Sequence, residues 1–298
     1  MMKNLDDDID AILITGPTAS GKSALALRLA RERDGVVINA DSMQVYDTLQ
    51  VLSARPSDEE MEGIPHFLYG HVPASQLYST GEWLRDVTPL LARLKDEGRF
   101  PVFVGGTGLY FKALIGGLSN MPGIPDNIRD LYRARLINEG SADLHRELTE
   151  VDPAVANVLN VQDGQRIVRA LEVITATGQS IAHFQGTSGP VIVDPARAQK
   201  IVVLPDRTVL HERINRRFEL MMDKGAIDEV KAILALGLSP DATAMKAIGV
   251  AQIAEMLAGR LTRQDAIARA SAATRQYAKR QMTWFRNQMG EDWERIAP

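Results

Sequence analysis

The chain has 298 residues, with 34 Lys and Arg against 38 Asp and Glu, which gives a formal net charge of −4 at pH 7. A composition of 45% hydrophobic and 24% charged residues excludes a disordered or fibrous chain, and the length predicts two domains. Cysteine is absent, which excludes disulfides, thiol nucleophiles, thiolate zinc sites and iron–sulfur clusters.

The N-terminal region and the apolar runs bear on location. The longest apolar stretches, such as residues 11–16, are about six residues long, whereas a bilayer span needs ~20. Residues 1–10 carry the acids Asp6, Asp7 and Asp8 and lack the basic-then-apolar order of an export signal. We therefore expect a cytoplasmic protein without a membrane segment.

Apolar runs alternate with helical patterns in the first third of the chain. The predicted elements are strands over 11–14, 36–38 and 101–104 and helices over 20–33 and 80–97. Strands that alternate with helices form parallel sheets through right-handed crossovers, and functional residues gather at the carboxyl ends of such strands. Gly16, Asp41 and Thr107 follow the three predicted strands.

One glycine-rich segment lies between a predicted strand and a predicted helix. It matches the pattern G-x-x-x-x-G-K-[ST], in which backbone N–H groups and a helix N-terminus converge on phosphate oxygens. Its residues, all candidate phosphate ligands, are Gly16, Pro17, Thr18, Ala19, Ser20, Gly21, Lys22 and Ser23. Lys22 adds a positive charge, and the Ser23 hydroxyl is a ligand for Mg²⁺, the expected cofactor. The pattern alone does not decide whether the phosphates belong to a nucleotide or to another compound.

The usual layout for ATP hydrolysis is missing. The third predicted strand ends in Gly-Gly, where a P-loop ATPase carries an Asp that orients the metal. Asp41 and Asp206, each after a β-run, are the acids left to organise a metal. Asp41 also stands where a general base would reach a substrate beside bound phosphates, although a turn or helix-cap role fits the same spacing.

The middle of the chain lacks β-runs. Helical patterns occupy residues 126–138, 142–150 and 164–176 between turn-rich flanks at 120–125 and 186–190. A β-run at residues 200–204 then precedes a tail that we predict to be all helical.

These patterns predict an α/β fold, a P-loop nucleoside-triphosphatase-like parallel sheet flanked by helices, with a helical insertion domain and a helical C-terminal part. The expected boundaries are 1–119 and 199–298 for the catalytic core with its helical tail, and 120–198 for the insertion.

Several segments together resemble the tRNA dimethylallyltransferase family, also called isopentenyl-tRNA transferase. The match runs nearly end to end. The segments are Gly16 to Ser23, Asp41-Ser-Met-Gln-Val-Tyr46, Gly105-Gly-Thr-Gly-Leu-Tyr110, Gln165 to Glu172, Arg213-Ile-Asn-Arg-Arg-Phe218, Ala247-Ile-Gly249 and Thr274 to Arg286.

The resemblance implies a reaction. The family transfers the dimethylallyl group from dimethylallyl diphosphate to the N6 amine of the adenosine 3′ of the anticodon, so the P-loop would hold the diphosphate. By the same resemblance Asp41 is the general base, while Thr18 and Arg217 serve the leaving diphosphate. The weakly nucleophilic N6 amine needs such a base as positive charge develops on it.

The resemblance also implies contacts with the tRNA anticodon stem-loop, for which the helical insertion is the expected binding domain. The implied residues are Asp41, Ser42, Met43, Gln44, Thr107, Arg129, Gln165, Arg166, Arg169, Lys246, Lys279, Arg280 and Arg286. Between residues 260 and 286 the chain has seven basic residues and one acid, a local charge of +6 that suits RNA.

Several of these residues also have a plainer interpretation. A spacing of 4, 3, 4 puts Arg275, Lys279, Met282 and Arg286 on one helix face, which is otherwise a solvated surface. Arg169 can pair with Glu172, and Thr107 can cap the helix that follows it.

The chain departs from the family at residues 46–56 and at Val250, where the family commonly has an aromatic residue. Alternative functions are prenyl transfer to free AMP or ADP, a nucleoside or shikimate-type kinase, and a non-catalytic RNA-binding ATPase. We expect a monomer.

Overall fold

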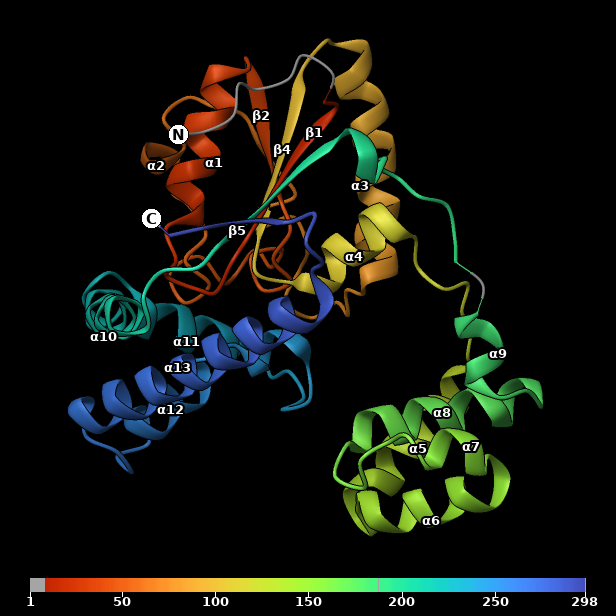
Figure 1. Cartoon of the computed structure of the whole chain (residues 1–298). Helices are drawn as coiled ribbons and strands as arrows, with labels where there is room; N and C mark the ends of the chain where they lie inside the picture. Colours follow the sequence, from red (N-terminus) through yellow and green to blue (C-terminus); the bar gives the residue numbers. More distant parts are fainter. Residues whose placement is uncertain (1–8, 187, 298) are drawn as a thin grey trace. The chain divides into compact units, whose positions relative to one another are not determined.

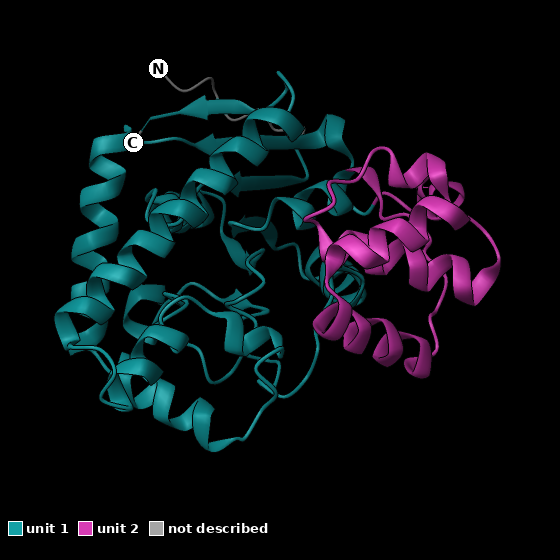
Figure 2. Ribbon diagram, turned by 90° about the horizontal axis from the view of Figure 1, so that it is seen from below, with its two compact units in different colours: residues 1–115, 192–298 teal, residues 116–191 magenta. Residues whose placement is uncertain are grey.

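The structure is a computed structural model that describes residues 9–186 and 188–297. Asp6, Asp7 and Asp8, and Thr187 in one predicted turn-rich flank, lie outside the described residues. The chain divides into two compact units, residues 1–115 with 192–298 and residues 116–191, shown in two colours in Figure 2. No helix among the described residues is long and apolar enough to cross a membrane.

The larger unit is built on a parallel sheet (Figure 1). The described strands are β1 (Ala11–Thr15), β2 (Gly35–Asn39), β3 (His66–Phe67), β4 (Phe100–Gly105), β5 (Ala198–Val203) and β6 (Glu294–Ile296), in the order β3-β2-β4-β1-β5-β6. All five strand pairs are parallel. The predicted α/β class with a parallel sheet is confirmed.

Two edge strands differ from the prediction. The tail is not all helical, because β6 pairs with β5, with Ile201 opposite Glu294. β3 likewise adds to β2, with Val37 opposite His66. Both strands are two or three residues long and none of their residues is buried, so neither has the apolar run by which a central strand is recognised.

Helices cover both faces of the sheet because alternate strand residues point to opposite sides. On one face, α1 (Lys22–Glu32) packs Leu25 and Leu29 on strand residues that include Ile12 and Val104. On the other face lie α3 (Thr80–Asp96), α4 (Gly108–Gly116) and the end of α13 (Arg263–Gln288), with buried residues that include Trp83 and Phe285. The short α2 (Asp58–Met61) and η1 (Pro195–Arg197) lie in connections.

The C-terminal helices form a second core of the same unit. They are α10 (Arg207–Asp223), α11 (Ala226–Ala235), η2 (Thr243–Lys246), α12 (Val250–Leu257) and α13 (Arg263–Gln288). Their apolar faces pack on the segment after β2, where Tyr46 and Leu49 are buried. This packing holds α10 and α13 near the loops that follow the strands.

The smaller unit is helical, as the sequence predicts. Its helices are α5 (Asp126–Glu139), α6 (Ser141–Val151), α7 (Pro153–Ala156), α8 (Gly164–Thr177) and α9 (Ile181–Gln185), around a core of its own. The compact unit spans residues 116–191, and the sequence predicts residues 120–198 for this domain. Where the chain returns to the larger unit, the N–H groups of Ile192 and Val193 both donate to the Leu114 carbonyl at 3.0 Å.

Candidate active site

The loops after β1, β2 and β4 start side by side. β4 lies between β1 and β2, with Thr15 opposite Gly105 and Asn39 opposite Val104. The Thr15 hydroxyl donates to the Gly105 carbonyl at 3.0 Å and ties two of the strand ends together. The residues after these strands therefore share one edge of the sheet, as predicted for Gly16, Asp41 and Thr107.

The phosphate loop curls between β1 and α1. A Cβ atom at Gly16 would lie 2.5 Å from the Val203 carbonyl oxygen, so only glycine fits there. Gly21 has φ +91° and Ala19 has φ 64°, so the loop needs left-handed backbone at two positions, one of them not glycine. Strained backbone of this kind is typical of ligand sites.

Lys22 is the first residue of α1 and stands near the end of the phosphate loop. Its Nζ atom donates to the Pro17 carbonyl at 3.4 Å. Burial lowers the pKa of Lys22 to about 8; the Asp41 carboxylate acts in the opposite direction, and the Arg217 guanidinium adds to the lowering. Lys22, Asp41 and Arg217 thus lie close enough to influence one another, although Arg217 comes from a distant part of the chain.

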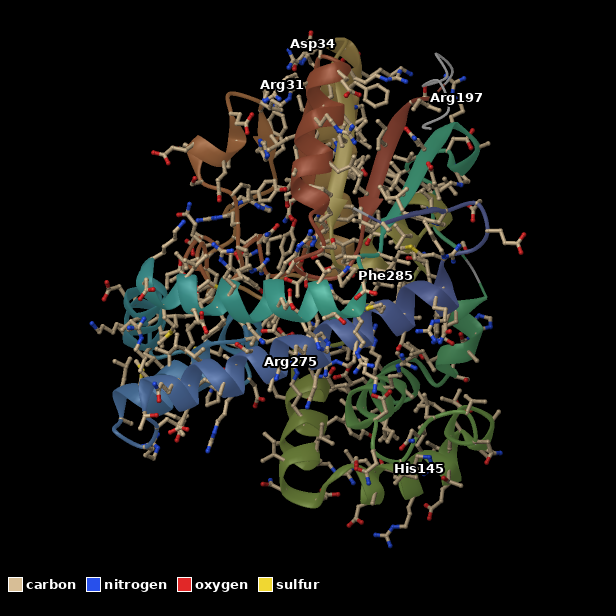
Figure 3. The ribbon with its side chains drawn as sticks, turned by 60° about the vertical axis from the view of Figure 1, so that its left-hand side comes forward. Arg31, Asp34, His145, Arg197, Arg275 and Phe285 are labelled. Carbon is tan, nitrogen blue, oxygen red and sulfur yellow. The ribbon has the colours of Figure 1, made fainter. Side chains whose placement is uncertain are left out.

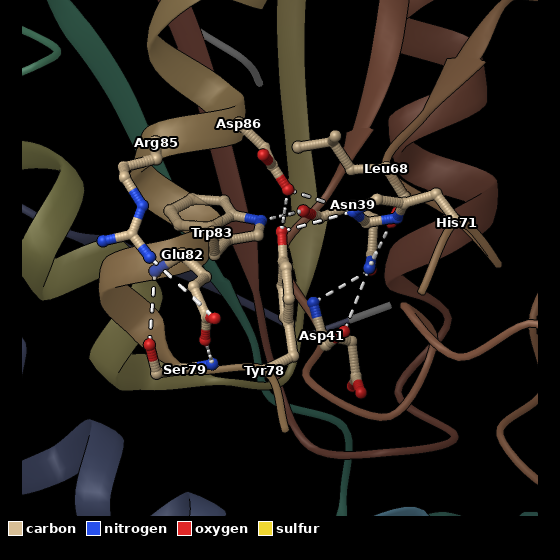
Figure 4. Close-up of polar contacts among 10 residues, drawn as sticks. All are labelled: Asn39, Asp41, Leu68, His71, Tyr78, Ser79, Glu82, Trp83, Arg85 and Asp86. Carbon is tan, nitrogen blue, oxygen red and sulfur yellow. Dashed lines mark hydrogen bonds and ion pairs between the residues drawn. The ribbon is translucent and has the colours of Figure 1, made fainter. Parts of the chain in front are cut away.

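Asp41 is held by the buried Asn39 (Figure 4). The Asn39 side chain accepts from the Asp41 N–H at 2.9 Å and donates to the carbonyls of Asp41 and Leu68 at 3.0 and 2.9 Å. The indole N–H of Trp83 donates to the Asn39 carbonyl at 2.9 Å. The backbone around Asp41 is therefore fixed by hydrogen bonds from both sides.

The Asp41 carboxylate has one oxygen in a turn and one toward the site. Oδ1 accepts from the Met43 N–H at 3.0 Å, so the turn role considered from the sequence is present. Oδ2 accepts no hydrogen bond among the described residues and lies 3.2 Å from where a Cβ of Gly106 would stand. Because one oxygen remains available, the turn role leaves Asp41 able to take a proton.

Arg217 reaches the phosphate loop from α10. Its Nη2 atom donates to the Thr18 hydroxyl at 2.9 Å. Burial lowers the pKa of the Arg217 guanidinium, while the negative charge of Asp41 acts to raise it. One turn earlier on α10, Nη1 of Arg213 lies 3.8 Å from where a Cβ of Gly21 would stand. Two guanidinium groups therefore border the loop.

Gln281 of α13 also enters this site. Its Oε1 atom accepts from the Thr18 N–H at 3.0 Å, and its Nε2 atom donates to the Gly106 carbonyl at 2.9 Å. The side chain is buried, with the residue 6% exposed. Gln281 thus joins the phosphate loop to the end of β4.

The segment after Asp41 packs on the loop after β4. The Thr107 hydroxyl accepts from the Ser42 N–H at 2.9 Å and donates to the Ser42 hydroxyl at 3.2 Å. Its side-chain partner is therefore Ser42, and not the helix that follows, which the cap interpretation predicted. Met43 packs against the second core. The Gln44 amide donates to the Ser53 and Ala54 carbonyls at 3.0 and 2.8 Å, which occupies both of its N–H donors.

The predicted basic face of α13 is divided. Arg275 donates to Asn215 of α10, and Met282 packs on Leu210 and Ile214, so these two residues do not share one open face with Lys279 and Arg286. Phe285 on the same helix is buried against the sheet side of the larger unit; Figure 3 labels it together with Arg275.

A hollow of about 470 Å³ lies along the exposed side of α13. Its lining residues are Gln276, Lys279, Arg280, Thr283, Trp284, Asn287 and Gln288. Arg280 lies over the Tyr277 ring, 5.7 Å from its centre. Trp284 fits against Gly108, where a Cβ would come within 2.1 Å of the indole ring. Lys279 and Arg286 are exposed.

The other residues expected to contact tRNA lie in the smaller unit and in η2. In the smaller unit, Arg166 pairs with Asp163 at 3.3 Å and Arg169 pairs with the buried Glu172 at 3.3 Å, the ion pair considered from the sequence. In the same unit, Gln165 is exposed and Arg129 is half-buried. Lys246 in η2 lies 3.9 Å from Asp241.

Besides Asp41, the sequence offers Ser23 and Asp206 as candidates to organise a metal. Ser23 is exposed in the first turn of α1, whereas Asp206 caps α10 by accepting from the Thr208 N–H at 2.8 Å. Within residues 9–186 and 188–297, no group of three or more His, Cys, Asp or Glu side chains could hold a metal ion.

Comparison with known proteins identifies the family. The family described as IPP transferase matches residues 44–288, and the family described as Isopentenyl transferase matches residues 9–69. The tRNA dimethylallyltransferase of Agrobacterium fabrum is 73% identical over all 298 residues and the full length of both chains. This chain belongs to the tRNA dimethylallyltransferase family.

Solved structures of this family agree. The tRNA isopentenylpyrophosphate transferase of Bacillus halodurans is 34% identical with a TM-score of 0.69, over 97% of this chain and 89% of that one. A eukaryotic dimethylallyltransferase, described as acting on tRNA, is 26% identical with a TM-score of 0.78, over 92% of this chain and 69% of that one. The resemblance read from the sequence segments and the P-loop fold class are both confirmed.

One buried residue at the phosphate loop, Gln281, is not predicted from the sequence. Gln281 lies in the segment from Thr274 to Arg286, whose charge drew attention to RNA alone. The i, i+4 spacing of Arg213 and Arg217 predicts that they share one helix face, and both guanidinium groups border the loop. The contacts of Gln281 span 263 and 175 residues, so no local pattern reveals them.

Proposed function

We propose that this protein transfers the dimethylallyl group of dimethylallyl diphosphate to the N6 amine of the adenosine 3′ of the anticodon in tRNA. The observation that carries the proposal is the position of Asp41. Its carboxylate is near enough to Lys22 and Arg217 to influence both of their pKa values, and Arg217 is itself hydrogen-bonded to Thr18 of the phosphate loop, so a proton acceptor lies near two cations at that loop. A base next to a leaving-group site is what transfer of an allyl group to a weak amine nucleophile requires.

The reaction forms one C–N bond, breaks one C–O bond and moves one proton from nitrogen to oxygen. The N6 lone pair attacks C1 of the allyl group, and the bond from C1 to the diphosphate oxygen breaks with its electrons going to diphosphate. The proton of the N6 amine passes to Oδ2 of Asp41. Lys22, Arg217 and the Thr18 hydroxyl stabilise the charge that grows on the diphosphate, and they do so more strongly in the transition state than before it.

We propose Mg²⁺ as the cofactor, held by the Ser23 hydroxyl and by the diphosphate itself. Because no described cluster of carboxylates can cage an ion, a metal in this site would depend on substrate oxygens, which is the usual mode for Mg²⁺. The Ser23 hydroxyl is exposed and has no protein hydrogen-bond partner among the described residues, so it is available as a hard oxygen ligand. The ion would neutralise diphosphate charge.

We propose that the anticodon stem-loop binds through three groups of residues. Ser42, Met43, Gln44 and Thr107 lie beside Asp41, and Thr107 and Ser42 hold each other through their hydroxyls. Lys279, Arg280 and Arg286 supply exposed positive charge on α13, and Lys246 lies in η2. Arg129, Gln165, Arg166 and Arg169 belong to the helical unit, which we propose as an RNA-binding domain. Positive charge of this kind gives phosphate contacts and salt-dependent affinity.

We further propose that the protein acts as a monomer in the cytoplasm. Asp41, Thr18, Lys22, Arg217 and Gln281 all come from one copy of the chain, so the proposed reaction needs no residue from a second copy. A tRNA acceptor is consistent with a cytoplasmic location.

The deciding experiment offers labelled dimethylallyl diphosphate and Mg²⁺ to the purified protein with three acceptors: bulk tRNA, AMP, or a nucleoside with ATP. Label in tRNA, mapped by nuclease digestion to the adenosine 3′ of the anticodon, supports the proposal. Label only on AMP shows a free-nucleotide prenyltransferase, and phosphate transfer from ATP without prenyl transfer shows a kinase. Omission of Mg²⁺ in a parallel reaction tests the cofactor.

A further inference from the structure

A single buried carboxamide connects the two halves of the reaction centre. Gln281 lies on α13 directly after Lys279 and Arg280, yet those two side chains are exposed and Gln281 is 6% exposed. Its amide is hydrogen-bonded at both ends, to the phosphate loop at 3.0 Å and to the strand end beside Asp41 at 2.9 Å. The catalytic roles assigned so far do not use this residue.

The partners of Gln281 fix its orientation. The Thr18 N–H is a donor and the Gly106 carbonyl is an acceptor, so only a side chain with one acceptor and one donor satisfies both. Thr18 is held a second time through its hydroxyl, by Arg217 at 2.9 Å. With its backbone held from α13 and its side chain from α10, Thr18 has little freedom to move away from the diphosphate.

The other end of Gln281 borders the base. A Cβ at Gly106 would lie 2.4 Å from Nε2 of Gln281 and 3.2 Å from Oδ2 of Asp41. The absence of a side chain at Gly106 therefore lets the carboxamide and the carboxylate lie on either side of the same residue. Any shift of Gly106 would change the space in front of Asp41.

We propose that Gln281 is a positioning residue that sets the distance between the leaving-group loop and the Asp41 carboxylate, through its two hydrogen bonds to Thr18 and Gly106. The proposal rests on the proposed function. Because α13 also carries Lys279 and Arg280, the residue links the helix that we propose to bind RNA with the reacting groups. Its loss should slow the chemical step and weaken diphosphate binding, while tRNA binding stays as it is.

The test compares three variants with a matched control. Gln281→Met keeps the length and removes both hydrogen bonds, Gln281→Asn is too short to span them, and Gln281→Glu keeps an acceptor for Thr18 but turns a carboxylate toward the Gly106 carbonyl. Gln264→Met makes the same change at an exposed position of α13. For each protein, kcat, the KM for each substrate, the Kd for inorganic diphosphate and the thermal midpoint are measured.

We expect Gln281→Met to lower kcat about tenfold and weaken inorganic diphosphate severalfold, because small misplacement of reacting groups is costly, with the KM for tRNA unchanged. Gln281→Asn should match it and Gln264→Met should equal the wild type. Unchanged kcat and diphosphate affinity in Gln281→Met, or a rise confined to the KM for tRNA, overturns the proposal.

A fallback variant covers a failure to fold, and the diphosphate affinity separates the positioning role from the proposed function. If Gln281→Met does not fold, Gly106→Ala is used, since its Cβ displaces the carboxamide from the opposite side; normal kcat in that variant overturns the proposal. If the wild type transfers no prenyl group to tRNA, the proposed function fails by that assay alone. The diphosphate affinity of Gln281→Met then still decides whether the residue positions the loop.

Discussion

The guanidinium of Arg217 and the hydroxyl of Thr18, 199 residues apart in the sequence, form a 2.9 Å hydrogen bond. The bond joins α10 to the phosphate loop, and Gln281 holds the same threonine through its backbone N–H. Three segments from the beginning, the last third and the end of the chain therefore meet at one residue.

This pair should act as a unit on the leaving group. We expect Thr18→Val and Arg217→Met each to lower kcat/KM for dimethylallyl diphosphate by about 10- to 100-fold, because each removes stabilisation of the departing charge. The double variant should be little worse than the poorer single variant, as for groups in one network. Arg216 is an exposed neighbour on α10, so Arg216→Met should leave kcat/KM unchanged. Multiplying effects in the double variant would contradict the joint role.

Removal of the proposed base, Asp41, should slow the chemical step. In Asp41→Asn the hydrogen bond from the Met43 N–H can be kept, so the turn should survive, but proton transfer from N6 is lost. We expect kcat to fall about 10²- to 10⁴-fold, the usual contribution of a general base, with tRNA affinity preserved. Single-turnover rates and filter binding measure the two effects. Asp47→Asn in the exposed loop is the control; equal rates for both variants would remove Asp41 from the mechanism.

Donor binding should depend on pH through Lys22. In the free protein its pKa is lowered to about 8, so the side chain loses its charge above that pH. A diphosphate favours the charged form, so binding above pH 8 takes up a proton. We expect the Kd of dimethylallyl diphosphate, measured without tRNA, to be flat below pH 8 and to rise by up to about tenfold per pH unit above it. Titration calorimetry in buffers of different ionisation enthalpy counts the proton; a flat Kd to pH 9.5 would exclude this role.

The exposed cations of α13 should make tRNA binding depend on salt. Lys279→Ala and Arg280→Ala should each weaken tRNA binding and reduce the slope of log K against log salt by about 1, because each phosphate contact releases about one counterion. Arg263→Ala is the control, since Arg263 at the start of the same helix is paired with Asp223. Slopes that match the wild type in both variants would mean that this face of α13 does not contact tRNA phosphates.

Asn39 should matter for stability as well as for the base. It is fully buried, and its side chain makes three hydrogen bonds around Asp41 and Leu68. Asn39→Ala leaves these buried groups unpaired, so the free energy of unfolding should fall by about 2–4 kcal/mol. Urea unfolding measures this, with Asn127→Ala on exposed α5 as the control. A loss below about 0.5 kcal/mol, the usual surface value, would show that the network carries little stability.

The central strands and the phosphate loop could be predicted because their signals are local. Residues 36–38 and 101–104 are short apolar runs of the kind that buried strands show, and the loop pattern fixes four residue types within eight consecutive positions. β3 and β6 escaped prediction because an edge strand of two or three partly exposed residues has neither length nor alternation.

The candidate site was predicted in part. Asp41, Thr18 and Arg217 came from the resemblance, while the position of Asp41 at a strand end came from the residues themselves. Gln281 could not be found in this way because an uncharged side chain within a basic helix gives no periodic or charge signal. Arg275 was placed on an open basic face because helical spacing does not show that Asn215 of another helix would bind it.

The hydrogen bonds from the N–H groups of Ile192 and Val193 to the Leu114 carbonyl hold together the two ends of the segment that contains the helical unit. The chain departs from the sheet unit and rejoins it at one spot, so for the pairing of β5 with β1 the whole helical unit behaves as a loop that is already closed. The entropy lost in closing such a loop grows only with the logarithm of its length. The junction is therefore a place where this segment can lengthen, shorten or be replaced by a few turn-forming residues while the sheet still assembles.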